Sequence, residues 1–150
     1  MNSKIGITFI FLLGLIACTK QGTPSSFSKT GKKKSHNMGL NCMSCHKFGG
    51  SGEGVFKFAG TVYDTTYTQT NPDCFVDFYT GPKGTGKLLK RIPVDGLGNF
   101  YSSGRISRIK GLYPSVVSAT GNVKYMGGQI SSGECNSCHG VTSPKIWVKN

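Results

Sequence analysis

The chain has 150 residues, 18 Lys and Arg against 6 Asp and Glu, a formal net charge of +12 and 6 cysteines. This length accommodates one ordinary domain and excludes a second large catalytic domain. Glycine accounts for 22 residues, about twice its usual share, and charged residues for only 16%, which argues against a helical bundle. The positive charge favours acidic partners, but it does not distinguish among anionic lipid, nucleic acid and acidic protein.

Residues 1–17 have the features of an export signal. Lys4 provides a positive charge before residues 5–17, an apolar run that is too short to span a bilayer permanently. The end of this run, LIAC at residues 15–18, resembles the lipobox of bacterial lipoproteins, which implies cleavage before Cys18 and attachment of lipid to its sulfur. An uncleaved signal anchor, or secretion with Cys18 free, is the alternative. Because Thr19 rather than Asp follows, the resemblance implies sorting to the outer membrane, with the leaflet left open.

A tether is expected between the lipidated cysteine and the folded domain. Residues 18–35 are polar, contain Gly, Pro and Ser, and include three consecutive lysines at 32–34, which is typical of a flexible linker. The lysines either contact anionic head groups or remain solvated. Residues 36–150 are expected to form the single domain, which the lipid would hold at the cell envelope.

Two pentapeptides, CMSCH at residues 42–46 and CNSCH at residues 135–139, share the spacing C-x-x-C-H. In this spacing two thiols reach the vinyl groups of one haem, and the following imidazole reaches the iron. Both motifs resemble those of c-type cytochromes, and an export signal agrees with haem attachment outside the cytoplasm. The resemblance implies two covalent haem c groups, attached through Cys42, Cys45, Cys135 and Cys138, with His46 and His139 as iron ligands.

Other uses of the cysteines remain open. The two pairs would make a four-cysteine zinc site if they converged, although zinc does not require a His after each pair. A thioredoxin-like redox site needs a βαβ context, which the sequence does not show, and disulfides within each C-x-x-C would remove little chain entropy. The sixth cysteine, Cys74, lies in an alternating strand pattern. It is expected to pack as a small hydrophobic residue, with a redox or intermolecular role as the alternative.

The second iron ligands are limited, because the chain has 3 histidines. His36 is the one outside the motifs, and it precedes Cys42 closely enough to cap the first haem. It could instead reach the second haem, a neighbouring molecule or solvent. For the second haem, Met126 is the nearest upstream thioether, and core packing is its alternative role. If no methionine binds, that iron keeps an open position or borrows a ligand.

Six segments between the motifs have strand patterns, with alternating or β-branched and aromatic residues separated by Gly, Pro, Asn and Asp turns. They are residues 55–63, 74–79, 87–94, 100–101, 113–119 and 122–125. We therefore expect a mainly β fold, a small antiparallel β-sandwich with one C-x-x-C-H segment before its first strand and one after its last. Seven strands would place the motifs at opposite poles, whereas an even number would bring them together.

Short stretches in this region look like the transthyretin-like, carboxypeptidase-regulatory-like β-sandwich over about residues 55–120. They are AGTVYD at residues 59–64, VDFY at 76–79 and VDGLGNF at 94–100. This resemblance implies a scaffold and no activity.

Together these patterns predict an exported, lipid-anchored dihaem cytochrome that exchanges electrons with an acidic redox partner. A haem-based ligand-binding module and a zinc- or disulfide-stapled surface lipoprotein are the alternatives. No catalytic residue is assigned, since the chain shows no acid-base pair and no nucleophile pattern. Binding of nucleic acid is disfavoured, because the basic residues are scattered rather than interleaved with aromatic residues.

Overall fold

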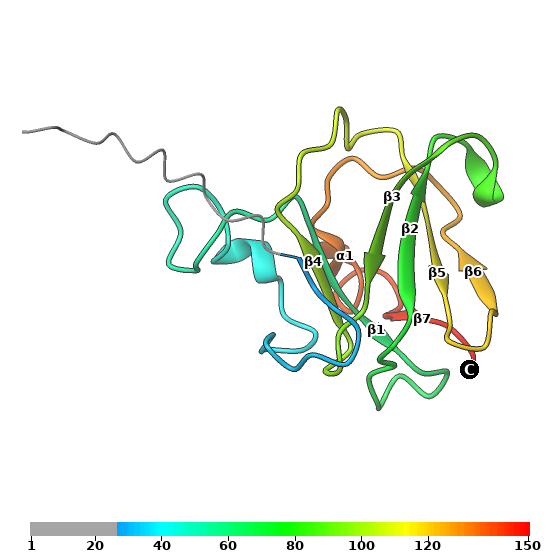
Figure 1. Ribbon diagram of the computed structural model, residues 1–150, viewed down its shortest axis with the longest axis horizontal. Helices are drawn as coiled ribbons and strands as arrows, with labels where there is room; N and C mark the ends of the chain where they lie inside the picture. The colour runs from blue at the N-terminus through cyan, green and yellow to red at the C-terminus, as the bar shows by residue number, and fades with distance from the viewer. Residues whose placement is uncertain (1–26) are drawn as a thin grey trace, which may run out of the picture.

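The computed structural model describes residues 27–150, and seven strands form within this range (Figure 1). The first six overlap the six segments expected from the sequence, so the prediction of a mainly β fold is confirmed. The strands are β1 (Phe58–Tyr63), β2 (Phe75–Tyr79), β3 (Leu88–Pro93), β4 (Asn99–Ser102), β5 (Tyr113–Val117), β6 (Val123–Tyr125) and β7 (Ile146–Trp147).

The strands form two sheets that pack face to face as a small sandwich. One sheet has the order β4-β1-β7 and the other has the order β3-β2-β5-β6. Neighbouring strands are antiparallel except for β1 and β7, which are parallel. The core between the sheets is apolar, and the rings of Phe58 and Phe78 meet in it with centroids 4.2 Å apart.

Helical structure in residues 27–150 is limited to three short turns. These are η1 (Cys42–Ser44), η2 (Pro82–Gly84) and α1 (Cys135–Cys138). No helix in this range has the length and apolar character that a membrane span requires. Two of the three turns, η1 and α1, coincide with the two C-x-x-C-H motifs.

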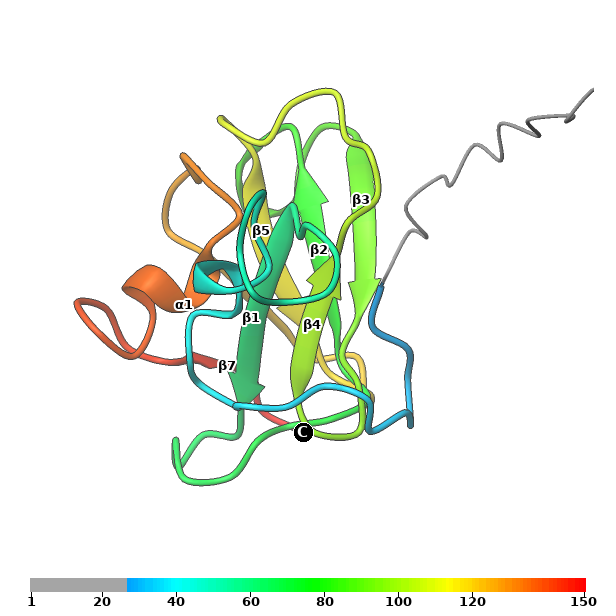
Figure 2. The same ribbon diagram turned by 90° about the vertical axis from the view of Figure 1, so that its left-hand side faces the viewer.

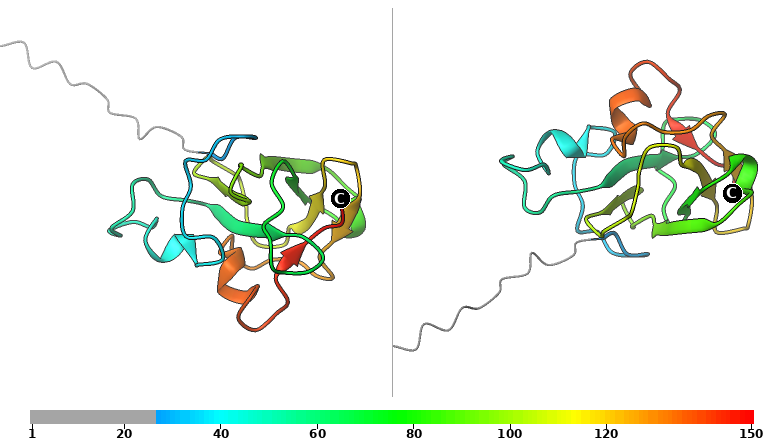
Figure 3. Two further views of the ribbon diagram at one scale, coloured as in Figure 1. Left: turned by 90° about the horizontal axis from the view of Figure 1, so that it is seen from below. Right: turned by 90° about the horizontal axis from the view of Figure 1, so that it is seen from above.

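Strand β1 is buried along its whole length, because other parts of the chain cover both of its faces. Phe58 and Val62 belong to the core. Thr61 faces the segment that leads to the first motif, since the amide of Gly39 donates to Thr61 Oγ1 at 2.9 Å. Figures 2 and 3 show η1 (cyan) and α1 (orange) side by side next to this strand. Strand β1 therefore positions both motifs.

One sequence prediction about the motif positions is wrong. The second motif does not follow the last strand, because β7 lies after it and pairs with β1 through Val62–Ile146 and Tyr63–Trp147. Six strands, β1 to β6, separate the two motifs along the chain, and the motifs lie together, as expected for an even number. The reason is that the chain crosses from one sheet at β6 to the other sheet at β7, and α1 lies in this crossover beside β1.

The chain packs on the domain earlier than the expected end of the tether at residue 35. Phe27 forms a β-bridge with Ser102, and the amide of Ser28 donates to the Tyr101 carbonyl at 3.0 Å. These contacts form because β4 is an edge strand with unpaired backbone groups. Residues 27–35 thus run along the domain. The expected signal segment and lipidation site, residues 1–17 and Cys18, lie outside the described residues.

Candidate functional site

The first motif is folded as a single helical turn. The Asn41 side chain accepts a hydrogen bond from the amide of Met43 at 3.1 Å and so caps the turn. The amide of His46 donates to the Cys42 carbonyl at 2.9 Å and closes it. This turn brings the thiols of Cys42 and Cys45 and the following imidazole into one short stretch of surface.

The His46 imidazole is held on three sides. Its Nδ1 lies 2.8 Å from the Glu53 carbonyl oxygen, and its ring stacks on Phe56 with centroids 4.2 Å apart. Phe56 in turn stacks on Tyr101 at 4.9 Å. On another side Gly52 is so close that an added Cβ would lie 2.8 Å from the imidazole ring. The orientation of His46 is therefore fixed by its surroundings.

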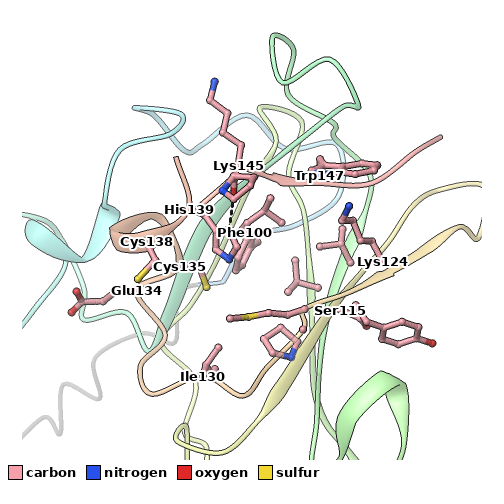
Figure 4. Close-up of a pocket in the computed structure, with 18 of the residues that line it drawn as sticks. Phe100, Ser115, Lys124, Ile130, Glu134, Cys135, Cys138, His139, Lys145 and Trp147 are labelled. Atoms are coloured by element: carbon pink, nitrogen blue, oxygen red, sulfur yellow. Dashed lines mark hydrogen bonds between the residues drawn. The ribbon is translucent and has the colours of Figure 1, made fainter. Parts of the chain in front are cut away.

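The second motif repeats the first arrangement. In α1 the amide of His139 donates to the Cys135 carbonyl at 3.0 Å. The His139 Nδ1 lies 2.7 Å from the Pro144 carbonyl oxygen, the contact drawn as a dashed line in Figure 4. Three successive amides after the motif, at residues 141–143, donate to the Cys138 carbonyl, which keeps the loop tight.

These two carbonyl contacts decide the tautomer of both imidazoles. A carbonyl oxygen can only accept, so Nδ1 of His46 and of His139 must carry the hydrogen. In a neutral imidazole the other nitrogen, Nε2, is then unprotonated. A hydrogen bond of this kind is what normally orients and strengthens a histidine that binds a metal. Both histidines are therefore prepared to ligate a metal through Nε2.

The first motif opens on a cavity of about 690 Å³. Cys42, Cys45 and His46 lie on its wall together with His36, the expected second ligand of the first haem. The rings of His36 and His46 are tilted by 36° with centroids 5.8 Å apart. This places His36 at the first motif, one of the positions left open by the sequence. Aromatic side chains complete the wall, namely Phe56 and Tyr101.

The second motif opens on a separate cavity of about 490 Å³, shown in Figure 4. Cys135, Cys138 and His139 lie on its wall together with Met126, the expected second ligand of the second haem. Its remaining wall is largely apolar and comes from both sheets. Trp147 forms part of it, and the Lys124 ammonium lies 3.0 Å from the centre of the Trp147 ring.

The residues at both cavities fit a covalently attached haem. Each cavity combines two thiols and one imidazole with a free Nε2. Both volumes fall within the range of about 300–1,000 Å³ that is usual for cofactor and ligand pockets. A zinc site fits less well, because within residues 27–150 no three His, Cys, Asp or Glu side chains converge on one point. All five described cysteines are unpaired.

The thiols of the two motifs differ in acidity. Burial raises the pKa of Cys135 to about 12, with a smaller contribution from the nearby Cys42 thiolate. Burial also raises the pKa of Cys42. Hydrogen bonds from Ser51 and Ser44 lower the pKa of the exposed Cys45. Before any haem is attached, Cys45 is therefore the more acidic thiol of its motif.

The remaining described cysteine, Cys74, is fully buried in the sandwich core beside residues such as Val76 and Val94. Burial raises its pKa to about 11. It therefore packs as a small hydrophobic residue, as the strand pattern predicts.

Several residues that shape the sites were not identified from the sequence. Phe56 and Gly52 hold His46 in place, and Asn136, inside the second motif, is buried and bonded to the chain before the first motif. The C-x-x-C-H spacing constrains neither the residues that follow the motif nor the two residues between its cysteines. The glycines after His46 were the one available signal, because close packing against a ring often requires glycine.

Comparison of the chain with protein-family models, with curated proteins and with solved structures gives no match. The resemblances to lipoproteins, to c-type cytochromes and to the transthyretin-like sandwich therefore stay expectations from the sequence.

Proposed function

We propose that this protein is an exported, lipid-anchored dihaem c-type cytochrome that transfers electrons. One observation carries the proposal: in both motifs the histidine donates Nδ1–H to a backbone carbonyl, at 2.8 Å for His46 and 2.7 Å for His139. Each of these histidines lines a cavity together with the two cysteines of its motif. Such an arrangement, present twice, is the one that covalent haem requires.

The residues of the chain have distinct roles in this proposal. The four thiols bond the two haems covalently, and His46 and His139 ligate the irons. His36 and Met126 are the candidates for the opposite positions, because each lines the cavity of one motif. When bound, the haems supply one-electron redox chemistry. Different opposite ligands would give the two haems different reduction potentials, with the methionine-ligated haem the higher.

The positive charge of the chain and the exposed cysteines of the motifs both support docking of a redox partner at the motifs. Cys45 and Cys138 are exposed, so an edge of each site reaches the surface. The strong positive charge, +12 for the full chain including Lys4 of the signal segment, would attract an acidic redox protein and accelerate its encounter. The lipid on Cys18 would hold the protein at the cell envelope, with the outer membrane as the proposed location.

A second candidate function is the binding of a small ligand at the iron of the second site. It is favoured by the position of Met126, which is 37% exposed and so is held by few neighbours. A weakly held thioether can be displaced by a diatomic ligand. Spectral changes on adding carbon monoxide to the reduced protein, restricted to the second haem, would distinguish this function from pure electron transfer.

The proposed function can be tested with the protein produced alongside a cytochrome c maturation system. The pyridine haemochrome spectrum gives the haem content per chain. We expect two haems in the wild type and one in each double variant, C42A/C45A and C135A/C138A. A Cys74→Ala variant is the matched control and should retain two haems. Wild-type protein without haem, or with zinc bound instead, would refute the proposal.

A further inference from the structure

The second motif interrupts a strand at the edge of the sheet. The segment before it pairs with β1 where Ala59 donates its amide to the Gly133 carbonyl at 3.0 Å. The segment after it pairs with the same strand at Val62, opposite Ile146. Between these two points the chain leaves the edge as a loop that contains the motif. The backbone of β1 at Thr61 is therefore paired with Asn99 of β4 on one side and has no strand beside it on the other.

The Asn136 side chain takes the place of the missing strand. The amide of Thr61 donates to Asn136 Oδ1 at 3.1 Å. Asn136 Nδ2 donates to Thr61 Oγ1 at 2.9 Å and to the Leu40 carbonyl at 3.0 Å. Asn136 is 4% exposed, so these bonds are made away from water. A residue between the cysteines of the second motif is thereby bonded to the chain just before the first motif.

The contacts continue to the backbone of His36. Thr61 Oγ1 donates to Asn99 Oδ1 at 2.6 Å and accepts the amide of Gly39 at 2.9 Å. Asn99 Nδ2 donates to the His36 carbonyl at 3.2 Å and to Ser35 Oγ at 2.9 Å. Asn136, Thr61 and Asn99 are all buried, and we refer to these three residues as the Asn136 network.

The Asn136 network leaves its members little freedom to rearrange. The Thr61 hydroxyl uses its one donor and accepts twice, which is its full capacity. Both asparagine amides are also bonded through oxygen and nitrogen, so neither can flip without losing contacts. By contrast His36 is itself exposed. Its position over His46 therefore depends on how residues 35–40 are held.

We propose that the Asn136 network positions His36 as the second ligand of the first haem and so makes that ligand dependent on the second motif. This inference rests on the proposed dihaem function. Asn136, Thr61 and Asn99 are positioning residues in it, since none of them is required to touch a haem. The two haem sites would then act as one unit built around β1, in which a change at the second motif alters the ligation of the first haem.

The test compares the ligation of the first haem in variants of the full mature protein. Electron paramagnetic resonance of the oxidised protein reports whether His36 is bound, with H36A as the reference for its loss, and intact mass reports the number of haems. We expect N136A and T61V to keep two haems while the ratio of unligated to His36-ligated first haem rises about tenfold or more. T61S, which keeps the hydroxyl, should restore the wild-type signal.

A matched control is S137A. Ser137 is adjacent to Asn136 in α1, but its hydroxyl has local contacts alone: it donates to the Glu134 carbonyl at 2.6 Å and lies 3.8 Å from Cys138 Sγ. Its removal should leave the first haem unchanged. Wild-type ligation in both N136A and T61V, or an equal change in S137A, would overturn the inference. So would a wild type that carries two haems but has the spectrum of H36A, and in that case the proposed function would still stand. A wild type without haem would overturn the proposed function as well.

Discussion

Replacing Gly52 by alanine should weaken the bond between His46 and the first haem iron. The added Cβ would lie 2.8 Å from the imidazole, whereas ordinary contact begins at 3.4 Å, so the ring must move by the difference, about 0.6 Å. It cannot move away freely, because Phe56 stacks on it at 4.2 Å. A shift of this size directed away from the Glu53 carbonyl would lengthen its 2.8 Å contact with Nδ1 to about 3.4 Å, longer than the usual hydrogen bond.

The expected loss is about 10–100-fold in the affinity of the histidine for the iron, which is typical when the orienting hydrogen bond of a metal ligand is removed. The thioether bonds should keep the haem attached. The measurement is therefore the spin state in the optical spectrum of the oxidised protein, in the C135A/C138A background that retains only the first haem. Gly128→Ala is the control, since no atom lies within 4 Å of its added Cβ. An unchanged spin state in G52A would refute the assigned role of the His46 environment.

Three further predictions concern the scaffold and the thiols. Phe78→Ala should lower the free energy of unfolding in urea by about 3–5 kcal/mol, because the ring is fully buried; a loss below about 1 kcal/mol would contradict the described core. Arg91→Ala should cost about 1–3 kcal/mol by the same measurement, because the fully buried Asp77 carboxylate loses the guanidinium at 2.7 Å and keeps only the Tyr79 hydroxyl at 3.2 Å; a neutral effect would contradict this pairing. In protein made without haem, iodoacetamide at about pH 8 should label Cys45 before Cys74. Hydrogen bonds lower the pKa of Cys45, whereas burial raises the pKa of Cys74 to about 11, so the thiolate fraction is larger at Cys45. The reverse order of labelling in peptide mapping would disprove this.

Strand positions followed from the sequence wherever a period of two residues and clear turns were present. This was the case for β1 to β6. The last strand, β7, was missed because Ile146 and Trp147 are too few to show a period, and because their pairing with Val62 and Tyr63 joins distant parts of the chain. The same long-range pairing decides where the second motif lies. The even number of strands between the motifs agrees with their proximity, but the sequence did not show that a strand parallel to β1 follows the second motif.

Residue types at the sites were accessible from the sequence, whereas their supporting contacts were not. The C-x-x-C-H spacing by itself names the thiols and the imidazoles. The role of Asn136 depends on an edge position left open beside Thr61 and on the approach of Leu40, and neither is visible in a local pattern. The position of His36 likewise follows from Gly39 and Asn99, and strands β1 to β3 lie between these two residues in sequence.

The most direct test of the central claim is the intact mass of the denatured mature protein, produced with a cytochrome c maturation system. Denaturation removes any haem that is not covalently bonded. A covalent dihaem protein should show a mass increase equal to two haems, in addition to the lipid expected on Cys18. A mass without haem, with all five cysteines of residues 27–150 still free to react with a thiol reagent, would contradict it.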